Sequence, residues 1–106
     1  MKINTQKDNF LGLPSKFSNI RNSKAAVVAV PFDGTATWRK GARNGPSAII
    51  EASQYIELYD IETGSEAYKS GIFTHTGSMK LQNPESMIAS VHGVVKKYLD
   101  RGMLPF

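Results

Sequence analysis

The chain contains no cysteine, so disulfides, thiolate nucleophiles, cysteine-ligated zinc and iron–sulfur clusters are excluded. It also lacks any apolar run near the roughly 20 residues that a membrane-spanning helix needs. The polar stretch from Met1 to Asn9 lacks the apolar core of a secretory signal peptide. These absences predict a cytoplasmic protein with no membrane partner.

Histidine is scarce, and neither of the two histidines belongs to a motif for catalysis or metal binding. The sequence has no His-x-x-x-Asp, His-Glu-x-x-His, Asp-x-Asp or Gly-x-Ser-x-Gly pattern. His75 follows an expected strand end and remains a candidate for lining a loop site. His92 lies at the edge of an apolar helix face and is expected to be a partly buried structural residue.

The excess of positive charge is modest, with 13 Lys and Arg against 9 Asp and Glu and a net charge of +4. The basic residues are scattered, apart from a local group at Arg39, Lys40 and Arg43. No stripe of basic and aromatic residues runs along the chain, so the sequence predicts no nucleic-acid partner. A length of 106 residues allows one small domain rather than two.

Three short apolar runs predict strands. The continuous, β-branched run from Ala25 to Val30 is typical of a strand buried on both faces in a parallel sheet. Residues 71–74 and 103–106 predict two further strands. Residues 56–60 fit either a helix extension or a short strand, and both interpretations remain open.

Two amphipathic segments predict helices. The first begins with Gly45 as the N-cap and Pro46 as the first helical residue, and it is expected to end near Tyr55–Leu58. Its expected apolar side consists of Ala48, Ile49, Ala52, Tyr55 and Ile56. The second helix is bounded by a capping Asn83 and by Gly102 at the C′ position. Its apolar positions are Met87, Ile88, Val91, Val94, Val95, Tyr98 and Leu99.

This alternation of strands and helices predicts an α/β fold with an open, mainly parallel sheet. Three short strands cannot cover both helices or bury residues 27–30 from both sides, so residues 1–106 are expected to form a single segment of one incomplete domain. Residues 1–22 carry few periodic signals and are expected to form an N-terminal arm. Its short apolar group, Phe10–Pro14, is expected to lie across another surface.

The loop at residues 31–45, between the first strand and the first helix, collects the strongest functional candidates. Its glycines permit tight turns, and they surround Asp33, Thr37, Arg39 and Arg43. Neither Gly-x-Gly-x-x-Gly nor Gly-x-x-x-x-Gly-Lys-Ser/Thr occurs here. Three interpretations remain open. The loop lines a site, its arginines tie it down by pairing with acidic groups or carbonyls, or free amides at the helix start bind a small anion.

This part of the chain resembles the N-terminal part of the arginase/agmatinase (ureohydrolase) family. The residues that carry the resemblance are Val30-Pro31-Phe32-Asp33-Gly34, Thr35, Thr37, Arg39, Gly41-Ala42-Arg43, Gly45-Pro46, Ala48-Ile49 and Ala52-Ser53. Phe10–Pro14 is similar to the arm ahead of the family's first strand, and Arg101–Phe106 to the segment before its Gly-Gly-Asp-His motif. The chain departs from the family at Thr74–Gly77, where many members have an Asp-x-Gly-Asp-like stretch.

The resemblance implies a three-layer α/β/α sandwich, an assembly into homo-oligomers, and hydrolysis of the guanidino compound agmatine to putrescine and urea. It also implies two Mn²⁺ ions that activate a water, held by histidine and aspartate ligands beyond Phe106. This chain alone is therefore expected to bind no manganese and to be inactive.

Asp33, Thr37, Arg39, Arg43 and His75 are accordingly candidates only for lining the substrate site or its loop, and no catalytic or metal-binding residue is assigned. Two other functions stay open. One is a non-enzymatic α/β module that associates with itself or with a partner, and the other is a small anion-binding domain.

Overall fold

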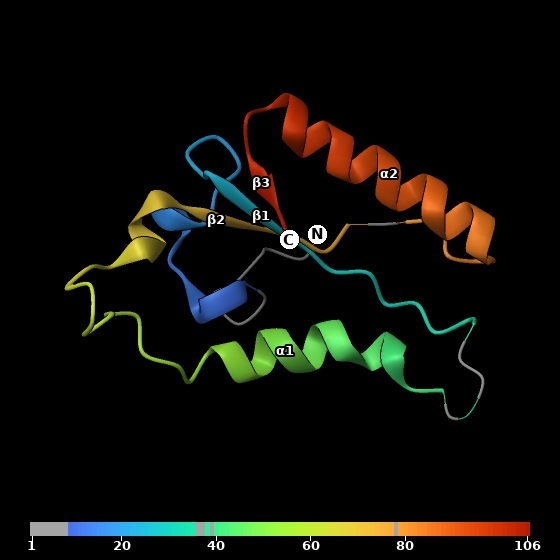
Figure 1. Cartoon of the computed structure of the whole chain (residues 1–106), viewed down its shortest axis with the longest axis horizontal. Helices are drawn as coiled ribbons and strands as arrows, with labels where there is room; N and C mark the ends of the chain where they lie inside the picture. Colours follow the sequence, from blue (N-terminus) through green and yellow to red (C-terminus); the bar gives the residue numbers. More distant parts are fainter. Residues whose placement is uncertain (1–8, 36–37, 39, 78) are drawn as a thin grey trace.

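A parallel sheet of three strands in the order β2-β1-β3 forms the centre of the molecule (Figure 1). The computed structural model describes residues 9–35, 38, 40–77 and 79–106. The central strand β1 (Ala25–Val28) pairs with β2 (Ile72–His75) on one side and with β3 (Leu104–Pro105) on the other. Ala25 is in register with Ile72 and with Leu104.

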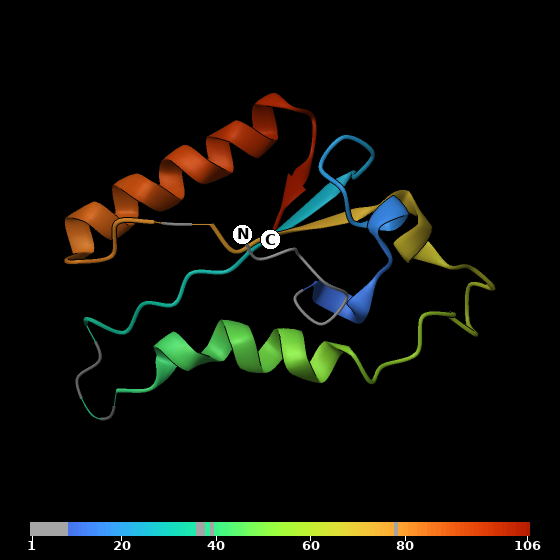
Figure 2. The ribbon, with the colours of Figure 1, turned by 180° about the vertical axis from the view of Figure 1, so that it is seen from behind.

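The two helices lie on opposite faces of this sheet, as the front and back views show (Figures 1 and 2). Helix α1 (Gly45–Ser53) connects β1 to β2, and α2 (Pro84–Asp100) connects β2 to β3. The first crossover leads from the central strand β1 to β2 at one edge of the sheet. The second leads from β2 back past β1 to β3 at the other edge. Right-handed crossovers then place the helices on different faces. The expected α/β fold is confirmed, with helix, sheet and helix in three layers.

Strand β1 is shorter and less covered than its composition predicts. It ends at Val28 rather than Val30, and only Ala26 is fully buried. A strand of this composition is buried on both faces in a complete sheet, and the expectation that three short strands cannot provide that cover agrees with the half-buried Ala25, Val27 and Val28. Strand β2 pairs with all four residues of β1, and the Val28 amide donates to the Phe106 carbonyl, so the edges of β1 are paired while its faces remain half-covered.

The core is small and lies between β1 and α2. Its buried members are Ala26, Tyr98 and Met103. Partly buried apolar side chains complete it: Ile20, Val28, Phe73 and Val94. The Phe73 and Tyr98 rings pack 5.9 Å apart in a tilted arrangement. The sheet and α2 are thus joined by a few aliphatic contacts and by Tyr98, whose ring packs against Phe73 and His75 of β2.

Helix α2 begins and ends at the predicted residues. The Asn83 side chain accepts a hydrogen bond of 2.8 Å from the Ser86 amide, which is the geometry of an N-cap. At the other end Gly102 has a φ of 76°, and its amide donates to the Leu99 carbonyl. The Met103 amide donates to the Tyr98 carbonyl. The two bonds together form a Schellman motif.

Helix α1 differs from its prediction at both ends and in orientation. It starts at Gly45, with Asn44 at the N-cap position after the 3₁₀ turn η4 (Ala42–Asn44), and it ends at Ser53. Its buried residues are Ile50 and Ser53. The side predicted to be its apolar contact surface is instead exposed, namely Ala48, Ile49, Ala52, Tyr55 and Ile56.

The N-terminal arm accounts for this orientation, because the 3₁₀ turn η2 (Phe10–Gly12) lies against both α1 and β2. The Phe10 amide donates to Thr74 Oγ1 and the Leu11 amide to Ser53 Oγ, each at 2.8 Å. Gln54 Nε2 donates to the Asn9 carbonyl, also at 2.8 Å. Polar bonds to the arm therefore decide which side of α1 faces inward.

The segment between α1 and β2 is a turn region that carries the 3₁₀ turn η5 (Ala67–Ser70). Residues 56–60 form neither the helix extension nor the strand considered above, apart from an isolated antiparallel bridge between Asp60 and Ser65. Tyr68 packs edge-on against Phe17 of the 3₁₀ turn η3 (Ser15–Phe17), with ring centroids 5.3 Å apart. Throughout the described ranges, every helix is too short or too polar to cross a membrane.

Candidate functional site

The carboxyl ends of the three strands meet at one edge of the sheet because all three are parallel. The chain leaves β1 there and enters a long loop, residues 29–44, before turning back through α1. Since β2 and β3 flank β1 on opposite sides, the first crossover goes one way and the second goes the other. This reversal of strand order is where open α/β sheets place ligands.

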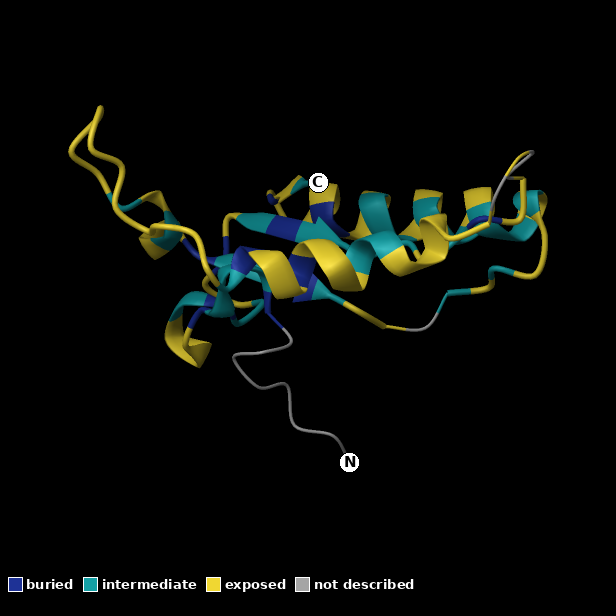
Figure 3. Ribbon diagram, turned by 90° about the horizontal axis from the view of Figure 1, so that it is seen from below, coloured by how far each residue is buried: buried dark blue, intermediate teal, exposed yellow. Residues whose placement is uncertain are grey.

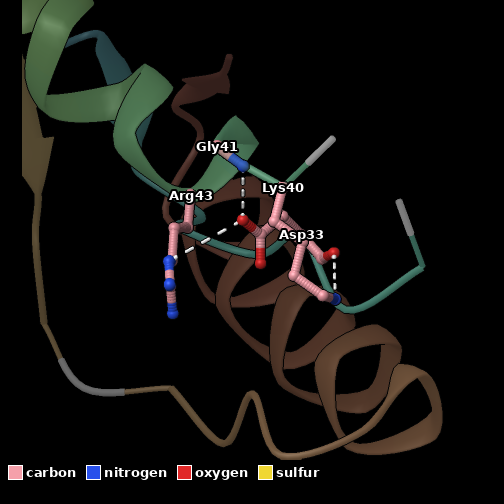
Figure 4. Close-up of polar contacts among 4 residues, drawn as sticks. All are labelled: Asp33, Lys40, Gly41 and Arg43. Atoms are coloured by element: carbon pink, nitrogen blue, oxygen red, sulfur yellow. Dashed lines mark hydrogen bonds and ion pairs between the residues drawn. The ribbon is translucent and has the colours of Figure 1, made fainter. Parts of the chain in front are cut away.

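Asp33 organises this loop. Its side chain is 8% exposed, and Oδ2 accepts a hydrogen bond of 2.8 Å from the Gly41 amide. The same oxygen lies 3.7 Å from Arg43 Nε (Figure 4). Lys40 Nζ donates to the Asp33 carbonyl oxygen at 3.3 Å. The loop is therefore closed between residues 33 and 43 by contacts to a single residue.

The contacts of Asp33 hold the backbone of its own loop, and none of them presents a reactive group. The Asp33 carboxylate is directed into the loop, toward the Gly41 amide and Arg43 (Figure 4). Arg43 is 65% exposed, so its ion pair is screened by solvent and adds little stability beyond the hydrogen bond. The contacts match the interpretation in which an arginine ties the loop down. Of the other two candidates from this loop, Thr37 and Arg39 lie outside the described residues.

Two contributors to this cluster were not singled out as site residues. Gly41 offers its amide with a φ of 151°, a conformation that favours glycine. Lys40 belongs to the local basic group of the sequence, but its contact is with a backbone carbonyl, which residue type cannot reveal. The glycine at position 41 was the available signal, because a φ of 151° is a conformation that residues with a Cβ rarely adopt.

His75 lies apart from the Asp33 cluster. It is the last residue of β2 rather than a loop residue, and its Nδ1 is 2.5 Å from the Tyr98 hydroxyl. Burial lowers the pKa of His75, and the positive charge of Lys97 lowers it further. Among the residues that the structure describes, its buried Nε2 has no hydrogen-bond partner, and a Cβ at Gly77 would lie 3.2 Å from it. Sequence reasoning could not anticipate Tyr98, which lies 23 residues away.

Of the two remaining sequence-based interpretations, the one for His92 is wrong and the one for anion binding at the start of α1 loses support. His92 is exposed on α2, so the expectation of a partly buried histidine is wrong. At the start of α1 the amides are already used in part. The Asn44 amide donates to the Gly41 carbonyl and the Gly45 amide to the Ala42 carbonyl. Fewer free amides remain for an anion than the sequence suggested.

The residues present do not fit a metal centre. Across residues 9–35, 38, 40–77 and 79–106, no three His, Cys, Asp or Glu side chains converge as ligands. Asp33 and His75, the two candidates with metal-ligating side chains, have separate partners. No catalytic step can therefore be derived through a metal bound by these residues.

Comparison with known proteins places these features in a family. The model of the arginase family matches residues 23–106. An N(1)-aminopropylagmatine ureohydrolase of Synechocystis sp. is 41% identical over 50% of this chain and 18% of its own length. An agmatinase of Halalkalibacterium halodurans is 31% identical over 83% of this chain and 31% of its own length.

A second N(1)-aminopropylagmatine ureohydrolase, from Thermus thermophilus, is 36% identical over 47% of this chain and 17% of its own length. The chain thus spans less than a third of the length of these relatives. No solved structure matches it. From the family match over most of its length, together with the parallel sheet and the loop after its central strand, we conclude that this chain belongs to the arginase family.

Proposed function

We propose that this chain is the N-terminal segment of an agmatinase-like ureohydrolase, which hydrolyses agmatine to putrescine and urea. The observation that carries the proposal is the family match over residues 23–106, which includes the whole loop after β1. An agmatinase aligned over 83% of the chain supports the same reaction. In this proposal the segment supplies the first strands of the sheet and one wall of the active-site edge.

The substrate class is a guanidino compound. Agmatine is the first candidate, and N(1)-aminopropylagmatine is the second because a ureohydrolase named for it shows 41% identity over half of the chain. In both reactions water adds to the guanidinium carbon, the bond to the substituted nitrogen breaks, and the departing amine takes a proton. The Asp33 carboxylate is already bonded within its loop, so it shapes the edge rather than selecting between these substrates.

The same proposal includes the cofactor, the cellular location and the assembly of the complete enzyme. A pair of manganese ions would serve the complete enzyme, with ligands outside the residues described here. The complete enzyme would be a cytoplasmic homo-oligomer. The chain alone would release no urea.

A chimera tests the proposed function. The segment of the Halalkalibacterium agmatinase that aligns with this chain is replaced by this chain, and urea release from agmatine is measured with and without Mn²⁺. We expect manganese-dependent activity within about tenfold of the parent, since the exchanged segment supplies scaffold rather than ligands. A chimera that folds and binds manganese but releases no urea from either guanidino compound contradicts the proposal.

Two controls make the result specific. The same chimera carrying Asp33→Ala tests the loop, and we expect reduced activity with manganese content retained, because the loop wall loses its anchor. The 106-residue chain assayed alone with Mn²⁺ is expected to give no urea. Urea release by that chain would show that its own residues hold the metal.

A further inference from the structure

The end of β2 is tied to α2 by a polar contact between two ring side chains. His75 Nδ1 lies 2.5 Å from the Tyr98 hydroxyl, and the two rings pack edge to face with their centroids 5.6 Å apart. Tyr98 is the buried residue of α2, and the rest of this helix is half-buried or exposed along its length (Figure 3). The helix is therefore fixed on the sheet through a side chain that bonds to a titratable ring.

The turn that follows β2 encloses the same imidazole. A Cβ at Gly77 would lie 3.2 Å from His75 Nε2 and 3.3 Å from Cε1, so the backbone of the turn lies close against the ring. Nε2 is buried, and the described residues offer it no hydrogen-bond partner. The backbone of His75 belongs to the sheet, because its carbonyl accepts from the Ala29 amide at 3.0 Å. The strand thus holds the backbone of His75, while α2 and the turn cover its ring.

Helix α2 supplies the ionisable groups that face His75. Burial lowers the pKa of His75, and the positive charge of Lys97 lowers it further. Lys97 Nζ lies 5.5 Å from the centre of the Tyr98 ring. Burial raises the pKa of Tyr98, and the charge of Arg101 opposes that rise.

The other elements that pack against β2 bring no ionisable side chain to this contact. These elements are β1 (Ala25–Val28) and η2 (Phe10–Gly12), and all of their side chains are apolar or absent. Among the described residues, no carboxylate forms an ion pair with His75. A proton on His75 would therefore meet a second cation and no compensating anion.

Protonation also changes the hydrogen bonds that the imidazole can form. In the neutral ring one nitrogen donates and the other accepts, so Nδ1 can accept the Tyr98 hydroxyl proton. An imidazolium donates from both nitrogens. Nδ1 then no longer accepts from Tyr98, and Nε2 gains a proton for which the described residues provide no acceptor. A buried donor without an acceptor costs more than an ordinary hydrogen bond contributes.

We propose that the His75–Tyr98 contact is a proton-sensitive latch between β2 and α2. Uptake of a proton from solvent by His75 ends the acceptor role of Nδ1, and the imidazolium reaches water when the C-terminal end of α2 moves off β2. The strands stay paired, because their hydrogen bonds use backbone groups only. The latch rests on contacts within this chain and does not depend on the proposed reaction.

The opposite face of β2 supplies a reference within the same molecule. Side chains alternate between the two faces of a strand, so Thr74 faces away from α2. Its Oγ1 accepts from the Phe10 amide at 2.8 Å, and Ser53 Oγ accepts from the Leu11 amide at the same distance. These groups do not titrate near neutral pH. The latch should therefore open the α2 side of the sheet and leave the arm in place.

Amide hydrogen exchange of the 106-residue chain at about pH 7.5 and about pH 5.5 provides the first test. Rates are compared as protection factors, which remove the intrinsic dependence of exchange on pH. A helix of 17 residues is marginal in water by itself, so its amides exchange once it leaves the sheet. We expect protection over residues 94–100 to fall by up to about tenfold, the limit for one proton and an ordinary histidine pKa of 6.5.

Protection of the Phe10 and Leu11 amides should be the same at both pH values. Equal protection of residues 94–100 at the two pH values overturns the proposal. A loss of the same size at Phe10 and Leu11 also overturns it, because the chain then unfolds as a whole and α2 does not open separately.

The variant His75→Gln separates the proton from the hydrogen bond. Its side-chain oxygen can still accept from the Tyr98 hydroxyl, and the amide does not titrate. We expect protection over residues 94–100 that no longer depends on pH. A variant that retains the wild-type fall in protection overturns the proposal.

A matched pair of lysine variants tests the latch without altering the core, so it applies even where His75→Gln does not fold. Lys96 and Lys97 are both exposed on α2, and Lys96 pairs with Asp100. The NMR titration of the His75 ring gives its pKa directly, a readout that a merely structural contact would not move. We expect Lys97→Gln to raise the pKa of His75 toward its ordinary value and to reduce the fall in protection. Lys96→Gln should change neither.

Two results with these variants overturn the proposal. One is a His75 pKa that rises in Lys97→Gln while protection of residues 94–100 at about pH 5.5 does not recover. The other is an equal shift of that pKa in both variants, because it is Lys97 whose amino group lies over the Tyr98 ring.

Discussion

At the scale of single residues, Asp33 holds the loop after β1 mainly through one oxygen atom. Removing the carboxylate in Asp33→Ala leaves the Gly41 amide without its acceptor and frees Arg43. We expect the free energy of unfolding to fall by about 1–3 kcal/mol, the cost of a lost buried hydrogen bond. Hydrogen exchange at Gly41 should accelerate by at least about tenfold.

The conservative variant Asp33→Asn separates hydrogen bonding from charge. Its amide oxygen can still accept from Gly41, so we expect a smaller loss of stability than in Asp33→Ala. Asp100→Ala serves as the control, because Asp100 forms an exposed pair with Lys96 and should change stability by less than about 1 kcal/mol. Equal exchange rates at Gly41 in the wild type and Asp33→Ala would contradict the anchoring role.

His75 gives the protein a pH dependence. Because burial lowers its pKa in the folded state, the unfolded chain binds a proton more readily. As the pH falls through the ordinary histidine value of 6.5, we expect the free energy of unfolding to decrease. The decrease should level off below the pKa of the folded state. Denaturant unfolding between about pH 8 and pH 5 measures this slope.

Replacement by a non-titrating residue assigns the slope to His75. In His75→Gln the part of the slope around the ordinary histidine pKa should disappear. The assignment to His75 is refuted if His75→Gln retains the wild-type slope.

At the residue scale, how well the sequence predicts a contact depends on how far apart the two partners lie along the chain. Asp33 and Arg43 lie ten positions apart in one glycine-rich loop, and an acid–base tie within it was one of the interpretations left open. The contact between His75 and Tyr98 joins a strand end to a helix 23 residues away. Residue type gives no sign of such a partner, because a buried tyrosine on an apolar helix face is usual without any histidine.

At the scale of elements, Gly71 fixes the approach of β2 to the strand beside it. Its φ is 91°, and a Cβ there would lie 2.6 Å from the Asn22 carbonyl oxygen and 2.7 Å from Ser23 Cα. Its own carbonyl accepts from the amides of Lys24 and Ala25. We expect Gly71→Ala to lower the free energy of unfolding by about 2–4 kcal/mol, through backbone strain and overpacking.

Gly93 provides the opposite case within α2. A Cβ at Gly93 would meet no atom within 4 Å, and the residue lies inside a regular helix. Gly93→Ala should raise the free energy of unfolding by about 0.5–1 kcal/mol, because alanine loses less backbone entropy. Chemical denaturation of both variants checks the pair. Similar changes in the two variants would show that local space and φ do not decide the outcome.

The two helices show which elements a sequence can specify. Helix α2 has a capping asparagine, a first-turn proline and a terminal glycine, and its bounds agree with the prediction. Helix α1 has apolar residues on several sides, so spacing alone could not choose its inward face. The hydrogen bond that Ser53 accepts from the Leu11 amide and the one that Gln54 donates to the Asn9 carbonyl made that choice. Spacing of apolar residues carries no information about such polar contacts.

At the scale of the whole molecule, folding and association should be linked. A dimer that forms only from folded chains stabilises the folded state by mass action, so the melting temperature depends on concentration. With an unfolding enthalpy of about 0.7 kcal/mol per residue, two copies of this chain would melt about 3 °C higher for each tenfold rise in concentration.

Differential scanning calorimetry over a hundredfold range of concentration measures this effect. Ile49→Glu and Ile88→Glu place a charge on the exposed side of α1 and of α2 respectively, and the variant that loses the concentration dependence identifies the helix in contact. A wild-type melting temperature that does not move with concentration would mean that the exposed apolar surface does not associate with itself. A dependence that survives Ile49→Glu would place the contact on another surface, such as the outer side of α2.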